Sequence, residues 1–206
     1  MKNKTVLFGI CGSFCNHAAI IEELKKLCIH NDVEVIVSQN VLQMNTRFHS
    51  ASTFIDELEA ITHHKVLATL ADGEAIGPRN AHDLMIIAPM SATVCAKITY
   101  GIYDHPISLA AKAMLRNQKK IVFGFASNDG LSISATNLMT LLNRKQFYAV
   151  PFYQDDVIHK PHSLIAKWDL LETTCDAALD NKQLQPILWR KWYEDTYCID
   201  YTIFRR

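Results

Sequence analysis

The chain has 206 residues, of which 49% are hydrophobic and 20% charged, and its formal net charge is zero. This length predicts one domain, over residues 1–206, with a substantial core. The balanced charge gives no electrostatic reason to expect nucleic acid or an acidic membrane as a partner, and no apolar run approaches the roughly 18 to 20 residues of a spanning helix.

Apolar, often β-branched runs alternate with helical patterns along the chain. The expected strands are residues 5–10, 33–37, 65–70, 83–88, 120–126 and 147–152. Several runs are continuous rather than alternating, which is typical of parallel strands covered on both faces. The sequence therefore predicts an α/β fold, a three-layer, doubly wound parallel sheet of the Rossmann or flavodoxin-like kind.

Helical patterns fill the segments between these strands. We expect helices over residues 18–28 and 92–100, a third beginning at Pro106, and a fourth with Ser163 as its N-cap. Two long connections, residues 38–50 and 154–162, are of a length that is more often functional than idle.

The two ends of the chain carry distinct signals. Two lysines and a short apolar run resemble a secretory signal, but Gly9, Gly12 and Asn16 interrupt it, so the run is interpreted as the first strand of a cytoplasmic protein. Residues 187–206 form an aromatic tail of mixed charge, expected to pack on the domain or on a neighbouring subunit.

The six cysteines give no sign of a metal site, because none forms a Cys-x-x-Cys pair. Most of them stand among apolar residues. We expect reduced, mostly buried side chains that behave as small hydrophobic residues, and no metal ligand set.

The loops that follow the expected strands are rich in hydroxyl and amide groups. In an open α/β sheet, ligands bind beyond the carboxyl ends of the strands. The candidates are Gly12, Ser13 and Phe14 after the first strand, Ser38 after the second, Pro89, Met90, Ser91, Ala92 and Thr93 after the fourth, and Asn128 and Asp129 after the fifth. Four such loops at one sheet edge predict a ligand site.

Ser13, Ser91 and Thr93 each have two interpretations. Ser13 heads an expected helix, whose free N–H groups and dipole favour a phosphate, and Gly12 permits close approach of the backbone. An ordinary helix cap explains the same residues. Pro89 stiffens the turn and cannot extend a strand ladder, which suits a rigid ligand wall.

Several segments together resemble a known family. They are "GICGSFC" (9–15), "NTRF" (45–48), "AIGPRNAHDLMIIAPMSAT" (75–93), "ISLAAKAMLRNQKKIVFGFASND" (107–129), "TNLMTLLNRKQFYAVPFYQDDVIHKPHSL" (136–164) and "KQLQP" (182–186). The chain resembles the dipicolinate synthase B subunits, within the flavoprotein superfamily that has the fold of the homo-oligomeric flavin-containing cysteine decarboxylases. The "PFYQDD…KP.SL" pattern discriminates most strongly, because the wider superfamily lacks it.

This resemblance implies a function. A Rossmann-like subunit of this family assists the oxidation of dihydrodipicolinate to pyridine-2,6-dicarboxylate in the mother cell of a sporulating bacterium. Its A subunit supplies the NADP site, and homo-oligomers, trimers or multiples of trimers, are expected. FMN is the implied cofactor of this chain.

The resemblance also implies roles for individual residues. Ser13 and Ser38 would lie near a flavin or nucleotide phosphate, and residues 89–93 match the segment that lines the flavin site. Asn128 matches the asparagine with which the decarboxylases grip a substrate carboxylate. Ala75 stands where those enzymes keep their catalytic histidine, and none of His63, His64 and His82 replaces it.

A diacid site should also offer positive charge. Arg47 suits a bidentate grip of a carboxylate, or is a solvated loop arginine; Lys160 and Arg79 are weaker candidates. Asp155 and Asp156 are solvated, hold a general base, polarise a cation of a partner, or cap the helix expected near Ser163. Asp129, at a strand end, is better placed for proton work.

Three hypotheses follow from the sequence. The first is an enzyme subunit that binds FMN or the diacid in the strand-end crevice. The second is a non-catalytic accessory subunit with a vestigial pocket. The third, disfavoured by Ala75, is a stand-alone flavin-dependent decarboxylase.

Overall fold

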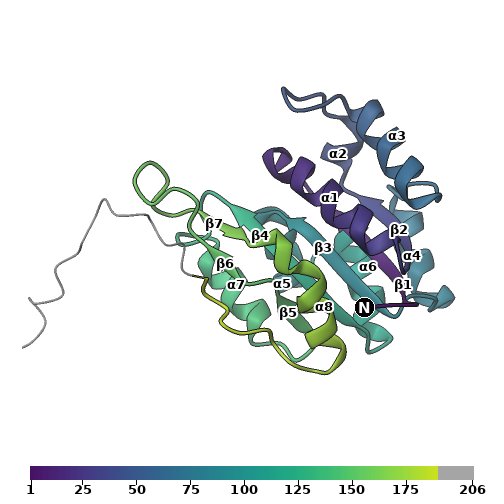
Figure 1. The fold of residues 1–206 in the computed structure, drawn as a ribbon. Helices are drawn as coiled ribbons and strands as arrows, with labels where there is room; N and C mark the ends of the chain where they lie inside the picture. Colours follow the sequence, from purple (N-terminus) through teal and green to yellow (C-terminus); the bar gives the residue numbers. More distant parts are fainter. Residues whose placement is uncertain (190–206) are drawn as a thin grey trace, which may run out of the picture.

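The computed structural model describes residues 1–189, which form a seven-stranded sheet between two layers of helices (Figure 1). The strands are β1 (Thr5–Ile10), β2 (Asp32–Val37), β3 (Leu84–Met90), β4 (Lys120–Ser127), β5 (Phe147–Ala149), β6 (Phe152–Tyr153) and β7 (Leu164–Ala166). β1 to β5 are parallel in the order β2-β1-β3-β4-β5. This order is the flavodoxin-like one and confirms the predicted fold class.

Helices cover both faces of the sheet. They are α1 (His17–Cys28), α2 (Gln39–Gln43), α3 (Ala51–Thr62), α4 (Leu70–Arg79), α5 (Ala92–Tyr100), α6 (Pro106–Arg116), α7 (Ala135–Leu142) and α8 (Leu171–Leu179), with short 3-10 turns η1 (Phe14–Asn16) and η2 (Trp168–Leu170). α1, α3 and α8 contribute to one core, and α4, α5, α6 and α7 to the other.

β1 shows why a continuous apolar run suits this architecture. Val6, Phe8 and Ile10 point into the core beneath α1 and α3, whereas Leu7 points into the opposite core, and all four are fully buried. Successive side chains of a strand alternate between faces, so a strand buried on both sides needs apolar residues at every position.

β4 pairs with different strands along its length. Residues Ile121–Phe123 of β4 pair in parallel with β5, whereas Ala126 and Ser127 pair antiparallel with β7, which in turn pairs with β6. The sheet therefore continues past the end of β5 as a small antiparallel extension. Loop 154–162 joins β6 to β7 (Figure 1).

Three predicted elements differ from the structure. Residues 65–70 form no strand: Leu67 alone bridges Ile36, and a capping box of Thr69 and Asp72 starts α4. Residues 147–152 are divided into two strands, and Pro151, which lacks an N–H, stands between them.

The helix predicted from Ser163 is replaced by β7, and α8 begins only at Leu171. Leu164 and Ala166 are both buried, so the apolar spacing there follows a strand period rather than a helical one. The helices near 18–28, 92–100 and after Pro106 are confirmed.

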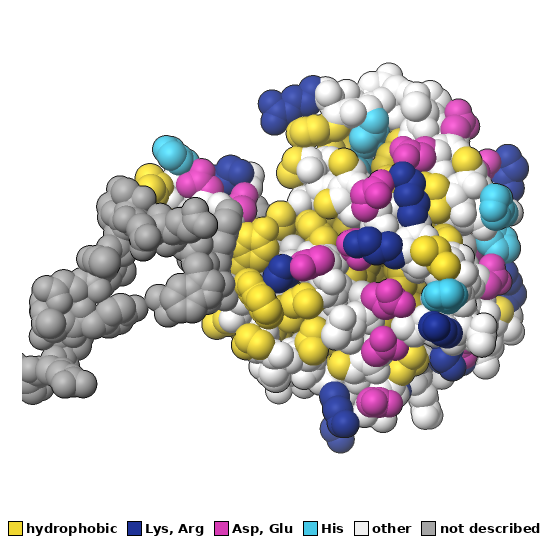
Figure 2. Space-filling view, viewed as in Figure 1, with side chains coloured by type: hydrophobic (Ala, Val, Ile, Leu, Met, Phe, Trp, Pro, Cys, Tyr) yellow, Lys and Arg dark blue, Asp and Glu magenta, His cyan; other side chains and the backbone are white. Residues whose placement is uncertain are grey.

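The surface agrees with the balanced composition. On the face shown in Figure 2, basic and acidic side chains are interspersed. Within residues 1–189, the fold contains no helix long and apolar enough to cross a bilayer. Most of the aromatic tail predicted over 187–206 lies outside the described residues.

Two glycines of α4 provide a matched test of its packing on α6. A Cβ added at Gly73 would lie 2.8 Å from the Pro106 carbonyl oxygen, which is backbone and cannot move away. At Gly77 the nearest atom, at 2.6 Å, is the flexible end of Arg116. We expect Gly73→Ala to lower the free energy of unfolding by about 1 to 2 kcal/mol, even after the gain in helix propensity from Gly to Ala. Gly77→Ala should lower it by about 0.5 kcal/mol or less, a small loss rather than a gain because the following Pro78 disfavours a helical alanine at position 77.

Urea denaturation of the two variants and the parent measures this difference. Equal losses at both positions would contradict the packing described for α4 and α6.

Candidate functional site

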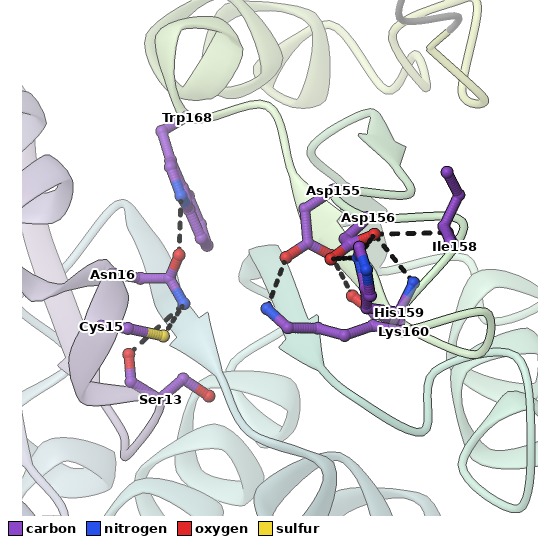
Figure 3. A network of polar contacts seen from close by, with 10 residues as sticks. Ser13, Cys15, Asn16, Asp155, Asp156, Ile158, His159, Lys160 and Trp168 are labelled. Atoms are coloured by element: carbon purple, nitrogen blue, oxygen red, sulfur yellow. Dashed lines mark hydrogen bonds and ion pairs between the residues drawn. The ribbon is translucent and has the colours of Figure 1, made fainter.

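Loops at the carboxyl ends of β1, β3 and β4 meet at a cavity of about 400 Å³. Its lining is Ser13, Cys15, Asn16, Ser91, Ala92, Thr93, Ala126, Ser127, Asn128, Asp129, Asp155, Lys160, Ser163, Leu164 and Ile165. Figure 3 shows Ser13 and Asn16 on one side of the site and Asp155 with Lys160 on the other. The cavity lies by the junction of β1 and β3, where flavodoxin-like sheets bind ligands.

The turn after β1 is fixed by Ser13, which adopts a left-handed conformation with φ of 69°. Its hydroxyl donates to the Ala126 carbonyl at 2.9 Å and so ties this turn to the end of β4. A Cβ added at Gly12 would meet only Phe14, at 4.0 Å, which leaves the backbone there open to close approach.

Asn16 connects this turn to a later part of the chain. Its side-chain amide donates to the Ser13 carbonyl at 3.3 Å, and its oxygen accepts from the Trp168 indole at 3.4 Å. Trp168 itself packs against Gly124 of β4, at which even a Cβ would find no room. The wall of the cavity therefore depends on a contact between β4 and η2.

The turn after β3 presents the start of α5. The register of β3 on β4 shifts between Ile87 and Met90, around Pro89, which has no N–H to donate. The Ser91 hydroxyl then caps α5 by accepting from the Val94 amide at 3.4 Å. The first N–H groups of this nine-residue helix face a site lined by hydroxyl groups, an arrangement that favours an anion.

The turn after β4 holds an ionised carboxylate. Asp129 accepts hydrogen bonds from the hydroxyls of Ser127 and of Ser134, the latter at 2.7 Å. The Ser127 hydrogen bond, aided by Ser134 and opposed by burial, lowers the pKa of Asp129. A carboxylate of low pKa is a weak general base, so this geometry favours a role for Asp129 in shaping the turn.

Loop 154–162 forms the opposite wall. Asp155 accepts from the Ser163 hydroxyl and pairs with Lys160, whose Nζ lies 3.2 Å from its Oδ2. Burial would raise the pKa of Asp155, but these two partners hold it below its usual value. Asp156 accepts from the backbone N–H groups of Ile158 and His159 (Figure 3). Hydrogen bonds between residues close in sequence thus determine the conformation of a loop that has no regular secondary structure.

Six predicted site residues line this one cavity: Ser13, Ser91, Ala92, Thr93, Asn128 and Asp129. The others lie elsewhere. Ser38 is buried and caps α2. Pro89 and Met90 lie within β3, and Gly12 stands one residue before the cavity lining.

Phe14 and Arg47 also lie away from this cavity. Phe14 lines a second cavity of about 290 Å³, which is bordered by residues of α1 and α3. Arg47 is exposed on a turn, with its guanidinium carbon 4.9 Å from the centre of the Phe48 ring.

Sequence reasoning gives too little weight to the wall formed by loop 154–162. It makes Lys160 and Asp155 secondary candidates, expects Ser163 to cap a helix, and assigns Leu164 and Ile165 no contact with a ligand. The signal that points to them is the discriminating "PFYQDD…KP.SL" pattern, which covers this whole wall.

A second polar cluster lies beside the β1 turn. His17 Nδ1 is 2.8 Å from His49 Nε2, and His17 Nε2 is 2.9 Å from the Cys11 carbonyl oxygen. Both rings stack on Phe54, with centroids 4.6 and 4.3 Å away. Burial of the ring, with the help of His49, lowers the pKa of His17 to about 4.

The cysteines follow the expectation of free thiols. Cys11, Cys95 and Cys175 are buried, Cys28 is partly buried, and Cys15 is exposed at the cavity, all without a disulfide. Burial raises the pKa of Cys11 and of Cys95 to about 12. Cys198 lies outside the described residues, and within the described part no group of three potential metal ligands occurs.

The chain is similar to a known protein family and to characterised proteins within it. Residues 1–169 match the model of the flavoprotein family. The chain is 36% identical over 189 residues to the B subunit of dipicolinate synthase from Bacillus subtilis (strain 168), covering 91% of this chain and 94% of that protein.

Solved structures show the same relationship. The crystal structure of the dipicolinate synthase B subunit from Bacillus halodurans has a TM-score of 0.84 and 34% identity, covering 93% of this chain and 98% of that one. The FMN-dependent cysteine decarboxylase SpaF, at 17% identity and a TM-score of 0.65 over 86% of this chain and 97% of its own, shares the fold. The chain therefore belongs to the flavoprotein family and, within it, to the dipicolinate synthase B subunits.

Proposed function

We propose that this chain is the B subunit of a dipicolinate synthase and acts with an NADP-binding A subunit to oxidise dihydrodipicolinate to pyridine-2,6-dicarboxylate. The setting would be the mother-cell cytoplasm of a sporulating bacterium. The convergence of the strand-end loops on one cavity carries the proposal, in a chain 36% identical to a dipicolinate synthase B subunit.

The residues of the cavity fit FMN. Its volume of about 400 Å³ is within the range of small-molecule sites, and the N-terminus of α5 with Ser13, Ser91 and Thr93 suits the phosphate. The open backbone at Gly12 permits close approach. Flavin, when bound, would supply a hydride acceptor.

The protein side chains would bind and orient the ligands. Ala92, Leu164 and Ile165 form an apolar wall that would lie against an aromatic ring and exclude water. The Asn128 amide would donate to a carboxylate, and ionised Asp129 would keep the turn that carries Asn128 in place.

The partners follow from the same relationship. The name of the Bacillus subtilis relative is that of one component of a larger enzyme, and we expect this chain to bind an A subunit as well as to self-associate, as trimers or multiples of trimers. Light scattering of the purified chain, alone and mixed with an A subunit, measures both associations.

A charge placed at Ser13 tests the flavin site. We expect Ser13→Asp to weaken FMN binding about tenfold or more relative to Ser13→Asn, because a carboxylate there repels the phosphate. Asn has the same size as Asp and also tolerates the left-handed backbone. The two variants differ in charge and in the donor that Asn retains toward the Ala126 carbonyl.

Isothermal titration with FMN measures the affinities, and a yellow colour on purification gives a first indication. If neither FMN nor the diacid binds, and Ser13→Asp is fully active in the reconstituted pair, the accessory-subunit hypothesis replaces this one. Ala75 disfavours a stand-alone decarboxylase, since it lies exposed on α4 and no histidine is among the described residues lining the cavity.

A further inference from the structure

Lys160 is the single cationic side chain among the described residues that line the cavity. The two carboxylates there already have partners: Asp129 accepts from Ser127 and Ser134, and Asp155 accepts from Ser163 and Lys160. An anionic ligand would therefore find its one ammonium group at Lys160, whose charge the ion pair with Asp155 partly offsets.

The ammonium group of Lys160 retains donors for a ligand. The Lys160 Nζ lies 3.2 Å from Asp155 Oδ2. This hydrogen bond uses one of the three N–H groups of the ammonium, and two remain for a ligand. The hydrogen bond to Asp155 raises the pKa of Lys160, so the group is charged at neutral pH. Its side chain is 48% exposed and lines the cavity.

The surrounding loop fixes this ammonium in position. The Lys160 amide donates to the Asp156 carbonyl and the Lys160 carbonyl accepts from the Ser163 amide, both at 3.0 Å. Figure 3 shows the Lys160 side chain extending toward the side of the site that carries Asn16 and Ser13. A long side chain held at both its backbone and its tip loses less entropy when a ligand binds.

We propose that Lys160 binds one carboxylate of a planar aromatic dicarboxylate and determines specificity for it, while Asp155 is a positioning residue that holds Lys160. The inference rests on the proposed function and deepens it by naming the group that recognises the second carboxylate. The apolar wall of Leu164 and Ile165 would lie against the ring.

Two acids that differ by one carboxylate test the proposal by titration calorimetry. We expect Lys160→Gln to weaken binding of pyridine-2,6-dicarboxylate about tenfold or more, and binding of pyridine-2-carboxylate about threefold or less. The preference for the diacid should therefore collapse. Lys160→Arg should retain most of the preference for the diacid. Asp155→Asn should reduce this preference, but less than Lys160→Gln does.

Matched controls separate this effect from others. Lys145→Gln removes an exposed lysine between α7 and β5, outside the cavity lining, and should leave both affinities unchanged. FMN should bind Lys160→Gln as it binds the parent, whereas a selective loss of FMN would assign Lys160 to the phosphate and overturn the inference.

The remaining outcomes also discriminate. If the parent binds FMN but not the diacid, or if Lys160→Gln keeps the preference for the diacid, the inference is wrong and the proposed function stands. If the parent binds neither FMN nor the diacid, the inference is wrong, and if Ser13→Asp is also fully active in the reconstituted pair, the proposed function fails as well.

Discussion

Gly124→Ala is expected to lower the free energy of unfolding by about 2 to 3 kcal/mol. The added Cβ would lie 2.4 Å from Cζ3 of Trp168, well inside van der Waals contact. Because Gly124 is in the middle of β4, the strand cannot shift without disturbing its pairing with β3 and β5. Trp168 must move instead, and its hydrogen bond to Asn16 at the cavity would be lost.

A double-mutant cycle identifies the cause. With Trp168→Leu in the background, Gly124→Ala should cost at least about 1 kcal/mol less, because the smaller side chain leaves room for the methyl group. Urea denaturation followed by circular dichroism gives all four stabilities. Additive losses would show that the Trp168 contact is not the source of the destabilisation.

His17→Gln is expected to reduce the acid sensitivity of the fold. Burial and His49 lower the pKa of His17 from 6.5 to about 4, so between these pH values the unfolded chain binds more protons than the folded one. Stability from this group is therefore present above about pH 6.5 and is lost as the pH falls toward 4, by about 3 kcal/mol in total.

The measurement is the free energy of unfolding in urea at several pH values from 7.5 to 4.5. The glutamine variant should be less stable than the parent at pH 7.5 and approach or exceed it at pH 4.5. His30→Gln, at an exposed position before β2, is the control for replacing a histidine by glutamine. Parallel profiles for the parent and His17→Gln would contradict a neutral, buried His17.

Much of the central sheet was predictable from sequence because β3 is apolar at every position and β1 and β4 are apolar over most of their length. β1, β3 and β4 are buried on both faces, and continuous apolar runs of this length are typical of such strands. Prediction from the local sequence was wrong where pairing with a distant strand determined the secondary structure. Residues 164–166 were expected to begin a helix, but they pair with Ala126 and Ser127 at the end of β4 and form a strand.

Some residues of the candidate site could be predicted from the sequence and others could not. Ser91 and Asn128 directly follow parallel strands, so the general rule for open sheets was enough to find them. Lys160 and Ser163 reach the cavity through the antiparallel extension, which no periodicity in the sequence indicates. Their position depends on the backbone pairing of β7 with β4, a contact between segments far apart in the chain.

Short segments and one side chain form hydrogen bonds with the edge strands of this sheet. Leu67 takes and gives backbone hydrogen bonds along β2, and residues 187–189 do the same along Phe152 of β6. At β5, the Gln183 side-chain amide pairs with the Ala149 N–H and carbonyl at 2.8 and 2.7 Å, as another strand would. Unpaired strand edges are templates for intermolecular β-pairing, so we expect these three segments to reduce the number of edge groups open to such pairing.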